Sequence, residues 1–201
     1  MTTLAEGALE RNDRYLREFV EALRICPYAK QCRETGKLHR RVLFRPEEAL
    51  PAIREIEALP EDSVEVALLI FPSAPAGNEQ AARDFESFCA GLRPQLSAFY
   101  CVAFHPDLPR DLLDAHRAVQ FIRRSPDPTL QLVRASVLRA VRGANDGGTR
   151  VLDPASMTLE QLMAVHSPLS LADRIAEANL ATLQRVGPDR IESLLGSLRK
   201  R

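Results

Sequence analysis

The sequence predicts an α/β domain with a small sheet of three strands, expected to be parallel and wrapped by helices from both ends of the chain. Three apolar stretches near residues 40–44, 64–71 and 98–104 have the composition of strands. The segments between them show helical spacing, and this alternation is typical of parallel sheets with right-handed crossovers. A length of 201 residues fits one domain. We therefore expect a single domain over 1–201 with its sheet core at 38–104.

The first half of the chain holds the clearest elements. Apolar residues from Leu9 to Leu23 recur at helical spacing. This helix should end or kink near Ile25 and Cys26, because Pro27 lacks an amide hydrogen and restricts the residue before it. Residues 64–71 are almost continuously apolar, as is typical of a strand buried on both faces. Further helices are predicted from Pro46 onward and over 78–93.

The remainder, 111–201, is predicted to be helical. Asp127 and Pro128 make a good helix start, because aspartate caps helices and proline favours the first helical position. A flexible, glycine-rich loop is expected at 143–150. The helix after Pro128 carries Leu130, Val133, Val137 and Val141 on one face. Residues 111–121 are predicted to form a short helix or an irregular turn, and further helices are predicted over 159–164 and 170–185 and from Pro188.

Composition limits the classes of function. Lys+Arg and Asp+Glu both number 27, so the formal net charge is zero. This disfavours nucleic acid as a partner, because binding it needs concentrated positive charge. No apolar run approaches the roughly 18 residues of a membrane-spanning helix, and the first residues lack the pattern of a secretion signal. We expect a cytoplasmic protein with no membrane partner and with its four cysteines reduced.

His105 and Asp107 follow the third predicted strand. Loops after parallel strands meet at one edge of the sheet, where α/β proteins usually bind ligands. An imidazole is suited to proton transfer near neutral pH, and a nearby carboxylate can orient it. Both residues are therefore candidates for catalysis. The alternative is a histidine that caps the strand end and bonds the backbone.

Arg123, Arg124 and Ser125 lie just before the predicted helix start at Asp127. Helix amino termini favour anions, and a guanidinium can hold a carboxylate or phosphate with two bonds. Arg134, close to the apolar face of the following helix, is expected to reach the same pocket. Taken alone, the pattern also fits an ordinary capped helix with Arg124 in solvent.

Cys26 lies at the predicted helix break, four residues before Lys30. A thiol in such a position can have a lowered pKa and act as nucleophile or ligand, and a packed, inert cysteine is the alternative. Asn179 falls on a predicted buried face of a later helix, so it either ties helices together or points into a pocket. Cys89 and Cys101 fall in apolar stretches and are expected to be core residues.

Four segments together resemble the DUF1415 family of bacterial proteins, whose members show Cys-Pro-Phe-Ala, Phe-His-Pro-Asp, Asn-Arg-Ser-Pro-Tyr-Pro and Asn-Ile-Ala-Thr-Leu in this order. The matching segments here begin at Ile25, Ala103, Arg124 and Asn179, and the resemblance spans roughly residues 14–187. It implies a shared pocket and supplies no reaction. The family's recurring polar residues fall on Cys26, Lys30, His105, Asp107, Arg124, Ser125, Arg134 and Asn179.

The resemblance implies that Arg124 is the arginine of the family motif, in place of the solvent-exposed side chain that the local pattern suggests. This chain departs from the family pattern at four positions, which suggests altered chemistry or substrate. Arg123 replaces asparagine, Asp127 tyrosine, Gln131 histidine and Ala135 glutamate.

We expect an enzyme acting on a small metabolite that bears a carboxylate or phosphate. His105, oriented by Asp107, would move a proton, with Cys26 assisting. The substrate-binding set would be Arg124, Ser125, Arg134, Lys30, Arg123 and Asn179.

Two alternatives remain open. The first is a haem or metal protein with His105 or Cys26 as ligand and with Cys32 or His39 as further donors, although no ligand motif of recognised spacing is present. No cofactor is otherwise predicted, because the chain lacks a phosphate-binding glycine loop and a dinucleotide fingerprint. The second is a non-catalytic binding or assembly module, whose last helix would pack against a second copy to form a homodimer.

Overall fold

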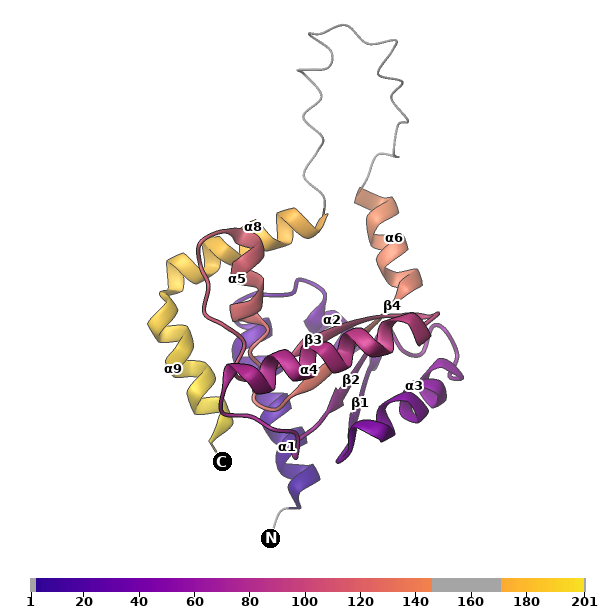
Figure 1. The fold of residues 1–201 in the computed structure, drawn as a ribbon. Helices are drawn as coiled ribbons and strands as arrows, with labels where there is room; N and C mark the ends of the chain where they lie inside the picture. The colour runs from indigo at the N-terminus through magenta and orange to yellow at the C-terminus, as the bar shows by residue number, and fades with distance from the viewer. Residues whose placement is uncertain (1–2, 146–170, 201) are drawn as a thin grey trace, which may run out of the picture.

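The computed structural model describes residues 3–145 and 171–200, and these contain a four-stranded mixed sheet (Figure 1). The strands are β1 (Leu38–Val42), β2 (Val66–Ile70), β3 (Phe99–Phe104) and β4 (Thr129–Arg134), in the order β1-β2-β4-β3. β1 pairs parallel with β2, whereas β4 is antiparallel to both β2 and β3. The predicted α/β class is confirmed. The predicted three-stranded parallel sheet is wrong in strand number, and two of the three observed strand pairings are antiparallel.

The strand that sequence reasoning missed, β4, occupies the centre of the sheet. Leu130 and Leu132 alternate with Thr129, Gln131 and Val133, and both leucines are fully buried on one face. That alternation is the period of a strand. The helical spacing predicted from Leu130 to Val141 arises because α6 (Ala135–Asn145) follows β4 directly. The apolar residues that suggested one helix therefore belong to two elements, a strand and a helix. The helix predicted from Pro128 is therefore wrong over 129–134 and correct from Ala135, and the predicted helical remainder contains a strand besides its helices.

Two hydrophobic layers cover the sheet, because successive side chains of a strand point to opposite faces. From β2, Ala67 and Leu69 join a cluster with α3 (Ala49–Glu57) and α4 (Glu79–Leu92). Leu68 and Ile70 face a second cluster. This one holds residues of α1 (Leu4–Arg14), η1 (Tyr15–Glu21), α5 (Ala115–Ile122), α8 (Leu171–Val186) and α9 (Pro188–Arg199).

The first helical stretch ends at Glu21, four residues before the end or kink predicted near Ile25 and Cys26. It is composite, since α1 continues into η1, a π-helix that buries Tyr15 and Phe19 against the sheet. A break follows, and α2 (Ala29–Glu34) leads into β1. The remaining short helices are η2 (Pro46–Glu48), which precedes α3, and η3 (Arg93–Gln95), which follows α4.

Part of the predicted carboxy-terminal half lies beyond the described residues. This applies to the helix at 159–164 and to most of the loop at 143–150. Within the described residues, no helix has both the length and the apolar character required to cross a membrane.

Candidate functional site

The candidate residues fall at two opposite ends of the sheet. At the His105 end, Phe104 of β3, Ile70 of β2 and Thr129 of β4 are aligned in register. At the Arg134 end, Phe99 of β3 lies opposite Arg134. Five residue steps of about 3.4 Å separate the ends along β4, a distance of about 17 Å. The direction of β4 therefore decides which motif residues meet.

His105 is completely buried, and both of its ring nitrogens have partners. Its Nε2 lies 3.0 Å from the carbonyl oxygen of Pro75, and the backbone N–H of Asp107 donates to Nδ1 at 3.2 Å. Because a carbonyl only accepts, Nε2 carries the hydrogen. Burial lowers the pKa of His105, although the Pro75 hydrogen bond and the Asp107 charge oppose this shift. The ring is therefore neutral at neutral pH and held in one tautomer.

Asp107 joins the turn after β3 to the loop after β2. Its Oδ2 accepts a hydrogen bond from the backbone N–H of Gly77 at 2.5 Å and lies 3.7 Å from Nδ1 of His105. Gly77 has a φ of +113°, which favours glycine. The Asp107 side chain keeps 16% of its surface exposed, so it is the member of the predicted catalytic pair that solvent reaches.

Two arginines converge beside Asp107. Arg124 donates from Nε to the carbonyl oxygen of Pro106 at 2.9 Å, and Arg199 donates to the same oxygen. Arg199 Nη1 also lies 3.6 Å from Asp107 Oδ1, while its Nε is buried without a hydrogen-bond partner. Burial and the neighbouring Arg124 charge lower the pKa of Arg199. Arg124 also donates a hydrogen bond from Nη1 to Oε1 of Glu192 on α9, at 2.6 Å.

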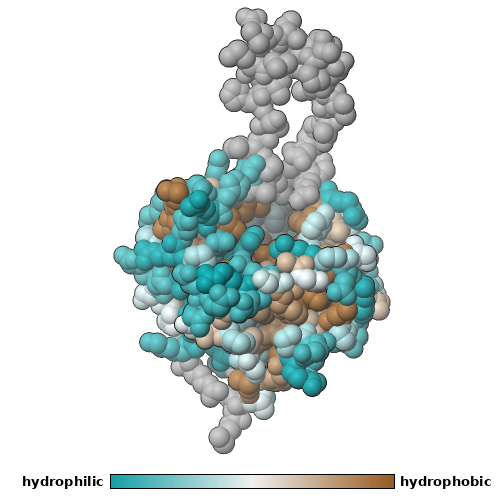
Figure 2. Space-filling view, viewed as in Figure 1, coloured by the Kyte–Doolittle hydropathy of each residue, from teal (hydrophilic) through white to brown (hydrophobic). Residues whose placement is uncertain are grey.

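Arg110 extends this cluster over the surface of α9. It pairs with Asp189 at 2.8 Å and lies 3.6 Å from Glu192. Arg110 and Arg124 both lie against the ring of Phe121, at 5.8 and 5.6 Å from its centroid. Figure 2 shows that hydrophilic side chains cover this part of the molecule.

The segment between Arg123 and Asp127 supports the loop around this end. The backbone oxygen of Arg123 accepts the N–H of His105 at 3.1 Å, and burial lowers the pKa of its guanidinium. Ser125 is buried and donates from Oγ to the carbonyl oxygen of Asp127 at 2.6 Å. Arg11 of α1 binds both carboxylate oxygens of Asp127, at 3.0 and 2.8 Å. Ser125 therefore holds the loop rather than facing a ligand.

Arg134 lies at the other end of the sheet. Its guanidinium stacks on Phe99, 4.7 Å from the ring centroid, and its Nε donates to the carbonyl oxygen of Val64 at 2.7 Å. It is buried, with Nη2 unpaired. The structure does not bring it to His105, contrary to the expected shared pocket.

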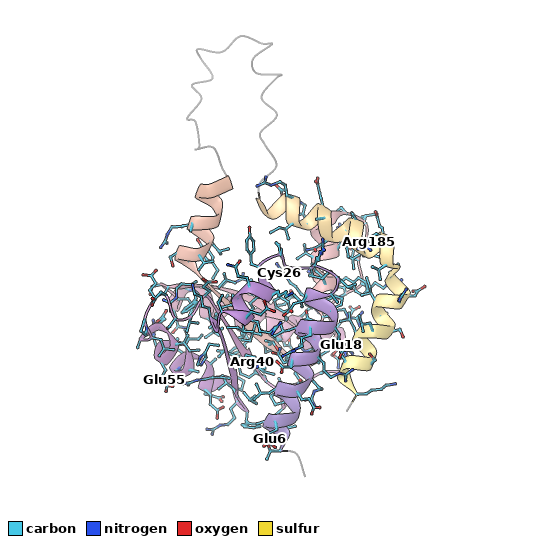
Figure 3. All side chains as sticks on the ribbon, turned by 180° about the vertical axis from the view of Figure 1, so that it is seen from behind. Glu6, Glu18, Cys26, Arg40, Glu55 and Arg185 are labelled. Carbon is cyan, nitrogen blue, oxygen red and sulfur yellow. The ribbon has the colours of Figure 1, made fainter. Side chains whose placement is uncertain are left out.

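Cys26 and Lys30 are also far from His105. Cys26 lies between η1 and α2, and in Figure 3 it lies toward the end of the molecule from which α6 rises. Its neighbour Cys32 interacts with the backbone of Val66, at the start of β2. Burial raises the pKa of Cys26, which opposes the predicted activation of this thiol. Lys30 is exposed, 4.0 Å from Glu34.

Asn179 is buried on α8, a helix that packs against α5. In the described ranges, 3–145 and 171–200, no group of three or more His, Cys, Asp or Glu side chains is placed to hold a metal ion. His105 and Cys26 lie at opposite ends of the sheet, so they cannot share one metal or haem iron.

Sequence reasoning missed Arg199, Arg110 and Glu192 as members of the cluster. The available signal was the charge of the last helix, since Asp189, Glu192 and Arg199 recur on it at spacings of three and seven. Three and seven residues place side chains on one helix face.

A family model described as a protein of unknown function (DUF1415) matches residues 8–167. The chain belongs to the DUF1415 family. The suspected membership is thus confirmed, and the match includes β4 and every strand of the sheet. No curated protein and no solved structure matches the chain. The motif residues of this DUF1415 chain accordingly divide between the His105 end and the Arg134 end.

Proposed function

We propose that this DUF1415 protein is an enzyme that binds a small carboxylate- or phosphate-bearing metabolite at the His105 end and transfers a proton there. One observation carries the proposal. The guanidinium groups of Arg124 and Arg199 converge on a single carbonyl oxygen, that of Pro106, beside the Asp107 carboxylate. A cytoplasmic setting forms part of the proposal, supported by the four free cysteines.

The anion would bind to Arg124 and Arg199. Guanidinium groups suit planar, two-point recognition of carboxylates and phosphates. The buried, unpaired Nε of Arg199 leaves a donor that an anion can satisfy. The Arg124 partner Glu192 is more exposed than Arg124 itself, at 39% against 13%, so it can swing away and leave the arginine to a ligand.

Asp107 would transfer the proton, and His105 would position it. His105 must break a hydrogen bond to take up or release a proton, because Pro75 and the Asp107 backbone occupy its nitrogens. Asp107 is partly exposed, with Oδ2 held by Gly77 and Oδ1 facing Arg199. In this arrangement Oδ1 of Asp107 is the base. The sequence predicted the opposite roles, with His105 moving the proton and Asp107 orienting it.

Calorimetric titration with inorganic phosphate and with citrate tests the binding step. Loss of a charge-assisted hydrogen bond costs roughly 1.5–3 kcal/mol, so Arg124→Gln and Arg199→Gln should each weaken binding about 10- to 100-fold. Arg83→Gln is the matched control, since Arg83 is exposed on α4 and pairs only loosely with Glu79, at 3.4 Å. Equal affinity in wild type and in the folded Arg124→Gln/Arg199→Gln double variant would contradict the proposal.

The proton-transfer step needs its own assay. Metabolites that bind should exchange carbon-bound hydrogen for deuterium in D2O, measured by proton NMR. Asp107→Asn should keep anion binding, within about threefold, and lose exchange. Exchange that persists in Asp107→Asn assigns the base elsewhere and removes Asp107 from this role.

A further inference from the structure

Cys89 and Cys101 form a thiol pair in the core and are not part of the cluster of Asp107, Arg124 and Arg199 at the His105 end of the sheet. Cys89 lies on the inner face of α4 and Cys101 on β3, and their Sγ atoms are 3.0 Å apart. Cys89 is 0% exposed and Cys101 5%. Phe85 and Leu92 flank Cys89 on the helix, and Phe99 and Ala103 flank Cys101 on the strand, all in the same core cluster. Two rigid elements therefore hold the sulfur atoms face to face.

We propose that Cys89 and Cys101 are a modification site at which a peroxide forms a reversible disulfide that links α4 to β3. A disulfide bond is about 2.05 Å long, so the sulfur atoms need to approach each other by only about 1 Å. A shift of this size lies within the ordinary motion of packed side chains. The inference is independent of the anion-binding proposal, because neither cysteine belongs to that cluster.

The surrounding charges favour the first step. The Sγ–Sγ hydrogen bond and the nearby Arg93 lower the pKa of Cys89, while the same hydrogen bond and burial raise the pKa of Cys101. Arg93 is anchored to this place, since its Nε donates to the carbonyl oxygen of Cys101 at 3.3 Å. Of the two thiols, Cys89 is thus the one that loses its proton more readily, and Cys101 keeps its proton. The thiolate is the reactive form of cysteine.

The chemistry balances with hydrogen peroxide as the two-electron oxidant. The Cys89 thiolate attacks one peroxide oxygen, the O–O bond breaks, and Cys89 sulfenic acid and hydroxide form. The Cys101 sulfur then attacks the Cys89 sulfur, the S–O bond breaks, and the S–S bond forms. The displaced oxygen leaves as water with the Cys101 proton. A dithiol reductant reverses the reaction by thiol–disulfide exchange.

Access is the remaining requirement. Among the residues that the structure describes, β3 has β4 as its only neighbour and so lies at the edge of the sheet, and Arg93 beside it is exposed. Hydrogen peroxide is hardly larger than water, so local opening of the α4–β3 contact admits it. Bulky alkylating reagents should react much more slowly with the same thiols.

Mass spectrometry of the intact wild-type protein tests the site. After treatment with hydrogen peroxide and quenching, we expect a mass lower by two hydrogen atoms and restored by dithiothreitol. Trypsin cannot separate the two cysteines, because Arg93 precedes Pro94 and no other Lys or Arg lies between them. Chymotrypsin, which cuts after Tyr100, should yield two peptides joined by the Cys89–Cys101 bond.

A matched variant locates the reaction. Cys26→Ser/Cys32→Ser removes the other two cysteines and should still lose two hydrogen atoms, whereas Cys101→Ala should stop at Cys89 sulfenic acid, trapped by dimedone. The oxidised wild type should also show a higher Tm than the reduced protein, because a cross-link restricts the unfolded chain. The proposal is overturned if peroxide leaves Cys89 and Cys101 reduced, or if the linked peptides contain Cys26 or Cys32 instead.

Discussion

The ion pair between Arg11 and Asp127 ties the first helix to the loop that enters β4. The guanidinium contacts both carboxylate oxygens, at 3.0 and 2.8 Å, and the two side chains are only 11% and 12% exposed. The Asp127 carbonyl oxygen separately accepts hydrogen bonds from Ser125 and Thr129. Asp127→Ala removes the carboxylate and keeps those backbone contacts. The variant therefore isolates the ion pair.

We expect Asp127→Ala to lower the free energy of unfolding by about 3 kcal/mol, at the lower end of the range for breaking a buried pair. The loss arises because Arg11 stays in a nearly buried place with its charge unpaired. At about 2–4 °C per kcal/mol for a chain of this size, Tm should fall by about 6–12 °C. Arg11→Met/Asp127→Leu leaves no unpaired charge and should recover most of the loss.

Urea denaturation followed by circular dichroism measures these differences, and Arg14→Met is the control. Arg14 pairs with Glu18 on the same helical stretch at 3.0 Å, but the side chains are 36% and 45% exposed. An exposed pair contributes less than about 1 kcal/mol. Our reasoning fails if Asp127→Ala matches Arg14→Met, or if the double variant loses the sum of its two single losses.

Three further predictions concern single residues. Burial lowers the pKa of His105 below 6.5 in the folded protein, so the unfolded chain binds more protons as pH falls through 6.5. Stability should therefore fall across that window. The fall should be shallower in His105→Asn than in the wild type, and equal slopes would refute this. Gly77→Ala should cost about 1 kcal/mol or more of unfolding free energy because φ is +113°. Gly91→Ala inside α4, where an added Cβ meets no neighbour, should be neutral or stabilising. Equal stabilities of Gly77→Ala and Gly91→Ala in thermal unfolding would contradict this prediction. Leu132→Ala, fully buried in β4, should cost about 2–5 kcal/mol. Gln131→Ala on the opposite face should cost under about 1 kcal/mol. A larger loss for Gln131→Ala than for Leu132→Ala in urea titrations would mean that Gln131, not Leu132, faces the core.

Sequence reasoning succeeded where one local rule determined the structure. The apolar run before Pro72 marked β2. Asn78 caps α4 by accepting the N–H of Ala81 at 2.9 Å, near the predicted start. These features depend on neighbours in the chain, which the sequence displays directly.

Sequence reasoning failed where structure depends on distant partners. Residues 129–134 fit both a strand and a helix, and only pairing with β2 and β3 decides between them. Arg199 reads as an ordinary basic residue at a helix carboxyl end. Its contact with Pro106 spans 93 positions of the chain. The candidate cluster was therefore predicted in part, through His105, Asp107 and Arg124.

The antiparallel course of β4 explains why one continuous motif cannot serve one pocket. The family segment from Arg124 to Arg134 enters the sheet beside Thr129 and leaves it at the other end. Arg124 therefore faces α9 at the His105 end, whereas Arg134 stacks on Phe99 about 17 Å away. Ser125 and Arg134 each donate a hydrogen bond to a backbone oxygen, and these bonds fix the loop before β4 and the end of the strand. Within this segment, Ser125 and Arg134 position the loop and the strand, whereas Arg124 is the residue that we propose binds the anion.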